Sequence, residues 1–339
     1  MNSFPLIVIY YLSVFFECKK LTTEENEKRL EVCGLALKPK VFNGREVKKN
    51  EAPWTVMVHT VAGGNTHGHC TGTVLSPRHV LTATHCSATG DLVQWIQNDV
   101  RYQFDKKDCE WDKTLIIPEV SASKVTILTR NGTTIGRAKF LYMFKYCRKI
   151  KDKETYDYQF PDDFMIVEVA EDLEYSSEVQ PACFARDIED NPLGTVLDFF
   201  GYGDNPPVHL AKSTSSKNRL LYQKINIIED SSNGYVFRTD PRIFIARSVS
   251  EQTIACPGDS GGGAISKIDG RNTVVGVAMR GSCEKMNRGK DAIEIYAAAG
   301  YYSEDVCELT GICNPPKASE RRTIIMTLFI STFIAFLVN

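Results

Sequence analysis

The sequence predicts an all-β fold of the barrel type. From residue 41 onward, short runs rich in β-branched residues alternate with turn clusters, for example at 125–128 and 273–277, which is the pattern of sheets closed into barrels. The chain has 339 residues, of which 43% are hydrophobic, and a single all-β domain of about 200–250 residues is ordinary. The net charge of −2 gives no indication of a nucleic-acid partner.

The N-terminal segment has the pattern of a secretory signal followed by a charged pro-segment. The run 6–16 is apolar and uncharged, which is typical of a signal peptide; a membrane anchor is the alternative, although the run is short for a span. We therefore expect a signal peptide at 1–18 and a pro-segment at 19–40, in which Thr22 and Glu25 predict a helix-capping box. The eleven cysteines of the chain suit an oxidising compartment.

The C-terminal segment 317–339 is a separate hydrophobic tail. Its apolar run at 324–338 follows Arg321 and Arg322 and is short for a membrane span. It also occupies the place of a removable lipid-anchor signal, so a spanning tail, an anchor signal and a simple extension all stay open. We expect a secreted protein, and any membrane attachment through this tail would hold it on the outer cell surface.

The most informative motif is the run Cys-Pro-Gly-Asp-Ser-Gly-Gly at 256–262. It puts Ser260 on a glycine-rich turn whose backbone can approach a ligand closely. The N–H groups of Gly258 and Ser260 are then candidates to converge on a tetrahedral oxyanion. A glycine turn of this kind also occurs by chance. Residues upstream of it must therefore distinguish a catalytic serine from an ordinary turn.

A nucleophilic serine needs a base, and the base needs an acid that orients it. No histidine follows Ser260 in the sequence; the six histidines are His59, His67, His69, His79, His85 and His209. The chain order Ser, acid, His is therefore impossible, whereas the order His, Asp, Ser is open. His85 ends an apolar run, and Asp163, rather than its neighbour Asp162, directly precedes another.

Three segments in this order resemble the trypsin/chymotrypsin family of serine proteases, in a divergent, nematode-type branch. The runs at 82–86, 163–167 and 258–262 are similar to the family signatures T-A-A-H-C, D-I-A-L-L and G-D-S-G-G. The resemblance covers residues 41–302. It implies two antiparallel six-stranded Greek-key barrels with a C-terminal helix, in a protease domain at 41–316.

The resemblance also implies the roles of the site residues. Ser260 is the expected nucleophile, His85 the base and Asp163 the acid that orients the base. Lys40–Val41 is the expected activation bond, because in the family the amine freed there pairs with the acid before the nucleophile, here Asp259. Asn43 stands where the family has glycine, which is a departure close to this bond.

The family pattern also supplies a disulfide proposal. It joins Cys33 with Cys183, Cys70 with Cys86, and Cys256 with Cys283, and Cys307 with Cys313 would close a C-terminal loop. Cys109 and Cys147 are left in the segment between His85 and Asp163, which is longer than in the family, and they are expected to pair with each other. A further disulfide common in the family is missing both of its cysteines here, and Ile245 occupies one of the two positions. The loss of both cysteines together indicates that this sequence has diverged from the family pattern. Because Cys70 has a disulfide partner in this scheme, the nearby histidines are not expected to hold zinc, and no metal or cofactor is expected.

The expected substrate pocket departs from that of trypsin-like members. Ile254 lies where those members place an aspartate, and Met279 and Arg280, followed by Gly281, stand where the family shows serine and tryptophan. An apolar side-chain preference is one interpretation of this pocket. Entry of Glu294 into the pocket is the other.

The sequence is compatible with two classes of function. The first is a secreted or cell-surface serine endopeptidase made as a zymogen, with a protein or peptide substrate and an activating protease as partners. The second is a non-catalytic protease homologue that binds proteins. A monomer is expected in either case, and Asn131 in Asn-Gly-Thr is a candidate glycosylation site on a surface hairpin.

Overall fold

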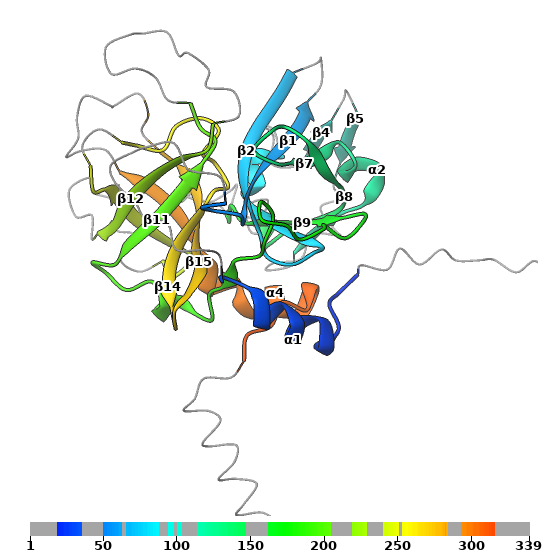
Figure 1. Ribbon diagram of the computed structural model, residues 1–339. Helices are drawn as coiled ribbons and strands as arrows, with labels where there is room; N and C mark the ends of the chain where they lie inside the picture. The colour runs from blue at the N-terminus through cyan, green and yellow to red at the C-terminus, as the bar shows by residue number, and fades with distance from the viewer. Residues whose placement is uncertain are drawn as a thin grey trace, which may run out of the picture.

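The computed structural model is all-β, with two closed antiparallel barrels that lie side by side (Figure 1). It describes residues 19–35, 50–62, 66–87, 94–97, 100–103, 114–146, 162–204, 219–228, 240–250, 253–281, 283 and 293–315. The predicted signal peptide, the bond Lys40–Val41, the C-terminal tail, Cys109 and Cys147 lie outside these residues. Within them, no helix combines the length and apolar character needed to cross a membrane.

The first barrel is a closed ring of six strands, because β8 pairs with β7 on one side and with β9 on the other. Its strands are β1 (Thr55–Ala62), β2 (Thr66–Val74), β3 (His79–Thr82), β7 (Val125–Leu128), β8 (Thr134–Met143) and β9 (Met165–Val169). The short strand β6 (Leu115–Ile117) is added to β8, next to helix α2 (Glu119–Ala122). A separate ribbon joins β4 (Gln94–Gln97) to β5 (Val100–Gln103).

The second barrel closes in the same way, through the pairing of β15 with β16. Its strands are β11 (Val196–Gly201), β12 (Leu221–Ile228), β13 (Ile243–Ser248), β14 (Gly263–Ile268), β15 (Arg271–Arg280) and β16 (Glu294–Ala298). The two-residue strand β10 (Cys183–Phe184) adds to β15 in parallel. The predicted six-stranded barrels are thus confirmed, and each carries one extra strand at an edge.

Strands at the junction of the barrels are buried on both faces. Along β3 and β9, alternate side chains such as Val80 and Val167 fill the first barrel, as the period of two in a strand requires. Their neighbours Leu81 and Ile166 point the other way, into a cluster shared with the second barrel. All five residues of β9 are buried as a result, which places the loop before β9 at this junction.

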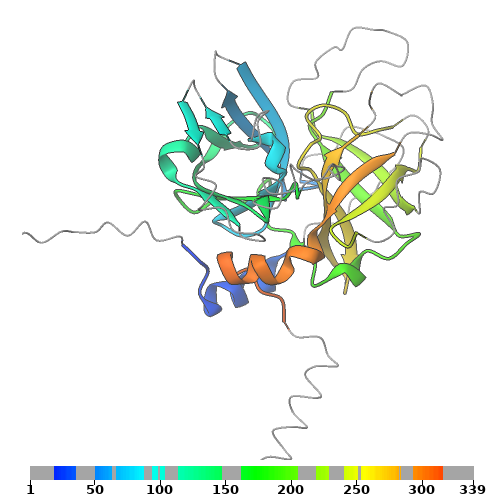
Figure 2. The same ribbon diagram turned by 180° about the vertical axis from the view of Figure 1, so that it is seen from behind.

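Helix α1 (Thr23–Val32) of the N-terminal segment packs beside the C-terminal helix α4 (Ser303–Thr310) (Figures 1 and 2). The predicted capping box is confirmed, since the Thr22 hydroxyl accepts from the Glu25 N–H and the Glu25 carboxylate accepts from the Thr22 N–H. Arg29 is only 2% exposed, and its Nη2 donates to the Cys313 carbonyl at 3.0 Å. The segment is therefore an integral part of the fold.

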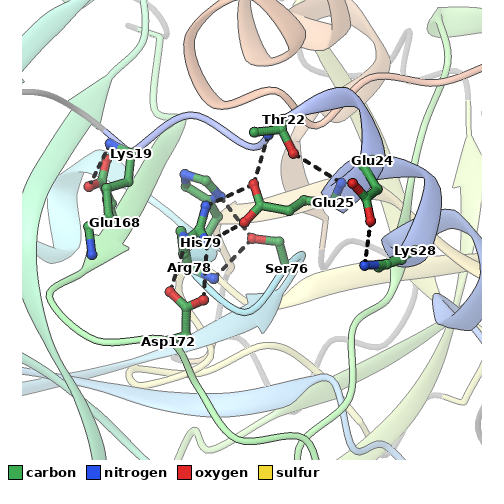
Figure 3. Close-up of polar contacts among 10 residues, drawn as sticks. All are labelled: Lys19, Thr22, Glu24, Glu25, Lys28, Ser76, Arg78, His79, Glu168 and Asp172. Atoms are coloured by element: carbon green, nitrogen blue, oxygen red, sulfur yellow. Dashed lines mark hydrogen bonds and ion pairs between the residues drawn. The ribbon is translucent and has the colours of Figure 1, made fainter.

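Charged side chains tie this segment to the first barrel (Figure 3). Arg78 bonds the Glu25 carboxylate with two nitrogens, at 3.1 and 2.5 Å, and also bonds Asp172 at 2.8 Å. The Arg78 guanidinium lowers the pKa of Glu25 to about 2. The Lys19 N–H donates to the buried carboxylate of Glu168 at 3.1 Å.

Candidate active site

His85 and Asp163 are brought together by the pairing of two strands. Strand β3 ends at Thr82, opposite Met165 at the start of β9. His85 follows β3 on a 3₁₀ turn (Thr84–Cys86), and Asp163 precedes β9 by two residues. Because the strands are antiparallel, the end of one and the start of the other meet at the same edge of the barrel.

The Asp163 carboxylate holds His85 at two points. Its Oδ2 lies 2.6 Å from the imidazole Nδ1, and its Oδ1 accepts the backbone N–H of His85 at 2.8 Å. Because a carboxylate accepts hydrogen bonds, this contact favours the imidazole tautomer that carries its proton on Nδ1, in which Nε2 is the basic nitrogen. The His85 side chain is 39% exposed, whereas that of Asp163 is 11% exposed.

Asp162, the neighbour of Asp163, points elsewhere. Its Oδ1 accepts from the Tyr302 hydroxyl at 2.7 Å, and its Oδ2 lies 3.2 Å from Arg242 Nη1. The two adjacent carboxylates therefore have different partners, and the contact with His85 belongs to Asp163.

The Ser260 turn is anchored on β2, the strand that precedes β3 and the His85 turn. Thr71 donates its N–H to the Ser260 carbonyl and its hydroxyl to the Gly258 carbonyl, both at 2.8 Å. Thr71 follows Cys70, which is bonded to Cys86 beside His85. The sequence did not single out Thr71; its place next to a predicted disulfide was the available signal.

Two N–H groups of this turn make no hydrogen bond to another described residue. Three other N–H groups of the turn donate to carbonyls. That of Asp259 donates to Cys256, that of Gly261 to Ala278 and that of Gly262 to Asp259. Among the described residues, no hydrogen bond uses the N–H groups of Gly258 and Ser260. Gly258 has φ of +99°, which favours glycine, and a Cβ there would lie 2.8 Å from His69 Nε2.

Asp259 points into the second barrel, away from solvent. It is 7% exposed, and its two oxygens accept from the N–H groups of Gly203 at 2.8 Å and Cys256 at 2.9 Å. A Cβ at Gly203 would collide with this carboxylate, so the close approach requires glycine. Burial raises the pKa of Asp259 to about 7, and the two N–H donors only partly offset that shift.

The residues predicted for the substrate pocket are of two kinds. Ile254 is partly exposed and Arg280 and Gly281 are exposed, and a Cβ at Gly281 would collide with the Ala255 carbonyl. This contact brings the end of β15 beside the segment before Ser260. Met279 instead is 8% exposed, in the core, where the register of β15 against β16 shifts.

Glu294 lies at the start of β16, behind the same segment. It is 1% exposed, and its carboxylate accepts from the Ala255 N–H at 2.8 Å, Gln223 Nε2 at 3.0 Å and the Tyr296 hydroxyl at 2.5 Å. Burial raises the pKa of Glu294. In this structure the carboxylate therefore holds the backbone of Ala255, one residue after Ile254.

Four disulfides lie among the described residues. They are Cys33–Cys183, Cys70–Cys86, Cys256–Cys283 and Cys307–Cys313. Sulfurs of Cys70 and Cys86 lie close to a ring nitrogen of His85. Because these sulfurs are bonded to each other, they are not thiolate ligands, and the cluster is a poor metal site.

Two closed six-stranded barrels, with a His–Asp pair and a Gly-Asp-Ser-Gly-Gly turn at their junction, define a protein of the chymotrypsin-like protease class. Residues 3–313 match the model of the nematode trypsin-6-like family. The match spans most of the chain, and the chain belongs to this family.

Two curated proteins are similar to this chain over 74% of its length. The chain is 23% identical over 254 residues to the Suppressor of tumorigenicity 14 protein homolog of Bos taurus, covering 74% of this chain and 26% of that protein. It is 26% identical over 258 residues to the CLIP domain-containing serine protease B15 of Anopheles gambiae, covering 74% of this chain and 65% of that protein. The chain thus spans less than two thirds of the length of either relative.

Proposed function

We propose that this protein is a secreted serine endopeptidase, made as a zymogen, that hydrolyses peptide bonds with His85, Asp163 and Ser260. The observation that carries the proposal is the exposed imidazole of His85, held at two points by Asp163. An orienting carboxylate and a solvent-facing ring are what a general base for a serine needs.

In this mechanism the Ser260 hydroxyl attacks the substrate carbonyl while His85 Nε2 takes its proton. Asp163 stabilises the imidazolium that forms and keeps the proton on Nδ1. The N–H groups of Gly258 and Ser260 donate to the oxyanion, and one such donor contributes about 10²–10³ in rate. His85 then protonates the leaving amine, and water hydrolyses the acyl-enzyme by the same steps.

Activation would follow cleavage of Lys40–Val41 by another protease. The α-ammonium of Val41 is the cation that would pair with Asp259, whose carboxylate is buried and accepts only two N–H groups in the described contacts. An unpaired buried carboxylate is costly. Pairing would therefore stabilise the turn that presents the Gly258 and Ser260 amides.

Secretion is supported by the disulfides and by the signal-like run at 6–16. We expect a monomer that acts on proteins or peptides, in the medium or, if the C-terminal tail holds it, on the outer cell surface. Asn131 is exposed on the hairpin between β7 and β8, which suits glycosylation.

A fluorophosphonate probe tests the function directly. An enteropeptidase site ending at Lys40 would allow cleavage that leaves Val41 as the new N-terminus. We expect labelling after cleavage and none before it, with Ser260→Ala as the unlabelled control. If folded, cleaved protein is not labelled, the endopeptidase proposal fails and the protein-binding homologue becomes the better account.

A further inference from the structure

We propose that Asp162 is a positioning residue for the His85–Asp163 pair, acting through a clamp that Tyr302 and Arg242 form on the second barrel. The effect of the clamp on catalysis rests on the proposed function. Its structural part, that the clamp aligns Asp163 with His85, can be measured without any turnover.

The clamp begins with the burial of Asp162. Its side chain is 1% exposed, and both of its oxygens have partners: the Tyr302 hydroxyl at 2.7 Å and Arg242 Nη1 at 3.2 Å. A carboxylate with both oxygens held has little rotational freedom. Since Asp162 and Asp163 share one peptide bond, fixing the first carboxylate restricts the backbone that aims the second.

Both partners of Asp162 are themselves fixed. Arg242 bonds Asp240 from Nε at 2.8 Å and from Nη2 at 2.6 Å, and its carbonyl accepts the Ala298 N–H at 2.7 Å. The Tyr302 ring stacks on Phe164, with ring centroids 4.3 Å apart. Asp162 is thus bound to the residue before β13 and to the end of the turn that follows β16, and both of these strands belong to the second barrel.

This arrangement spans the junction in which the site lies. Asp163 bonds His85 on the first barrel, and Asp162, one residue earlier, is bonded to the second, which also carries Ser260. The clamp therefore fixes the acid of one barrel relative to the barrel that supplies the nucleophile. Misplacement by about 1 Å in such a constellation can cost about 10²-fold in rate.

Tyr302→Phe is the sharpest test, because it removes one hydroxyl and leaves charge and ring stacking unchanged. On cleaved protein we expect kcat to fall about 10-fold with KM unchanged. We also expect the pKa of the His85 imidazolium to fall by about half a unit, because a misaligned Asp163 stabilises it less. That pKa is measured by NMR of the imidazole against pH, in the Ser260→Ala background.

Tyr222→Phe is the matched control. The Tyr222 hydroxyl donates to Asp198 at 2.6 Å in the second barrel, so this variant also loses a Tyr–Asp hydrogen bond. It should lose comparable stability but keep the wild-type kcat and the wild-type imidazolium pKa. Asp162→Asn is a second variant, which keeps an acceptor for Tyr302 but loses the ion pair with Arg242, and it should change both readouts in the same direction as Tyr302→Phe.

The outcomes separate this inference from the proposed function. If the wild type does not turn over, the endopeptidase proposal fails, yet the NMR titration still tests the clamp. If Tyr302→Phe and Asp162→Asn fold and both keep the wild-type imidazolium pKa, the clamp does not position Asp163 and the inference is overturned. The inference is also overturned if the imidazolium pKa shifts equally in Tyr302→Phe and in Tyr222→Phe.

Discussion

The two halves of the candidate site satisfy their carboxylates in different ways. In the first barrel, Asp163 meets a histidine at 2.6 Å. In the second, the carboxylates of Asp259 and Glu294 are buried and accept only from N–H and hydroxyl donors in the described hydrogen bonds. The first barrel therefore holds its part of the site with an internal partner, whereas the second has carboxylates that a cation would stabilise.

The largest expected effect is on the Ser260 turn. Asp259→Ala removes the carboxylate that the Val41 ammonium would pair with, so we expect a secreted protein whose peptidase activity is lost even after cleavage at Lys40. Asp269→Ala, at a side chain that is 81% exposed, is the control and should keep full activity. Full activity in Asp259→Ala would rule out the activation scheme and the contrast between the barrels with it.

The next effect is on the pH dependence of stability before cleavage. Because burial raises the pKa of Asp259 from 3.8 to about 7, the folded state binds a proton there that the unfolded state releases. The stability of the uncleaved protein should therefore fall as pH rises from about 4 to about 7, by a few kcal/mol at most. Glu294, whose pKa is also raised, acts in the same direction.

Urea unfolding at pH 5 and pH 8 measures this dependence. Asp259→Asn should reduce the difference between the two pH values in the uncleaved protein. Cleavage at Lys40 should reduce it too, since pairing with the new ammonium would lower the pKa of Asp259. An unchanged difference in Asp259→Asn would show that this carboxylate is not the source.

A smaller effect is expected where the N-terminal segment meets the first barrel. Glu25 has a pKa lowered to about 2 by Arg78, so its contribution is present above about pH 4.5 and lost as pH falls toward 2. Glu25→Gln should cost about 1 kcal/mol in the free energy of unfolding at pH 7, since the pair is only half-buried. Glu24→Gln, whose side chain is 76% exposed, is the control and should change little.

The smallest effect is expected at the tip of the β7–β8 hairpin. Asn131→Gln in protein from a eukaryotic secretory host should remove one glycan, seen as a mass loss, with activity unchanged and stability within about 0.5 kcal/mol. Asn233, in Asn-Gly-Tyr, has no sequon, so Asn233→Gln should leave the mass almost unchanged. Equal masses for Asn131→Gln and the wild type would mean that the site is not used.

Local signals in the sequence account for much of the fold. The strand at 125–128, the hairpin turn that carries Asn131 and the capping box of Thr22 and Glu25 each depend on residues a few positions apart. The order of His85, Asp163 and Ser260 also indicated the barrels through the family resemblance. Such features can be predicted because short-range chemistry or a known motif determines them.

Long-range contacts of single side chains could not be predicted in the same way. The contact of Asp162 with Tyr302 joins residues 140 positions apart, and that of Arg78 with Glu25 joins residues 53 apart. Nothing near Asp162 in the sequence distinguishes a clamp from a second candidate acid. The sequence offered Glu294 in the pocket only as an alternative. Its hydrogen bonds to Ala255 and Gln223 depend on how β16 closes the barrel, which the sequence alone does not determine.

The bond between Cys33 and Cys183 has a consequence for what the activating cut can release. The two cysteines are 150 positions apart in sequence, on either side of residue 40. A cut at Lys40 would therefore yield a light and a heavy polypeptide that migrate together on a gel until a reductant is added. The propeptide would accompany the enzyme as a permanent second chain, and dilution would not remove it.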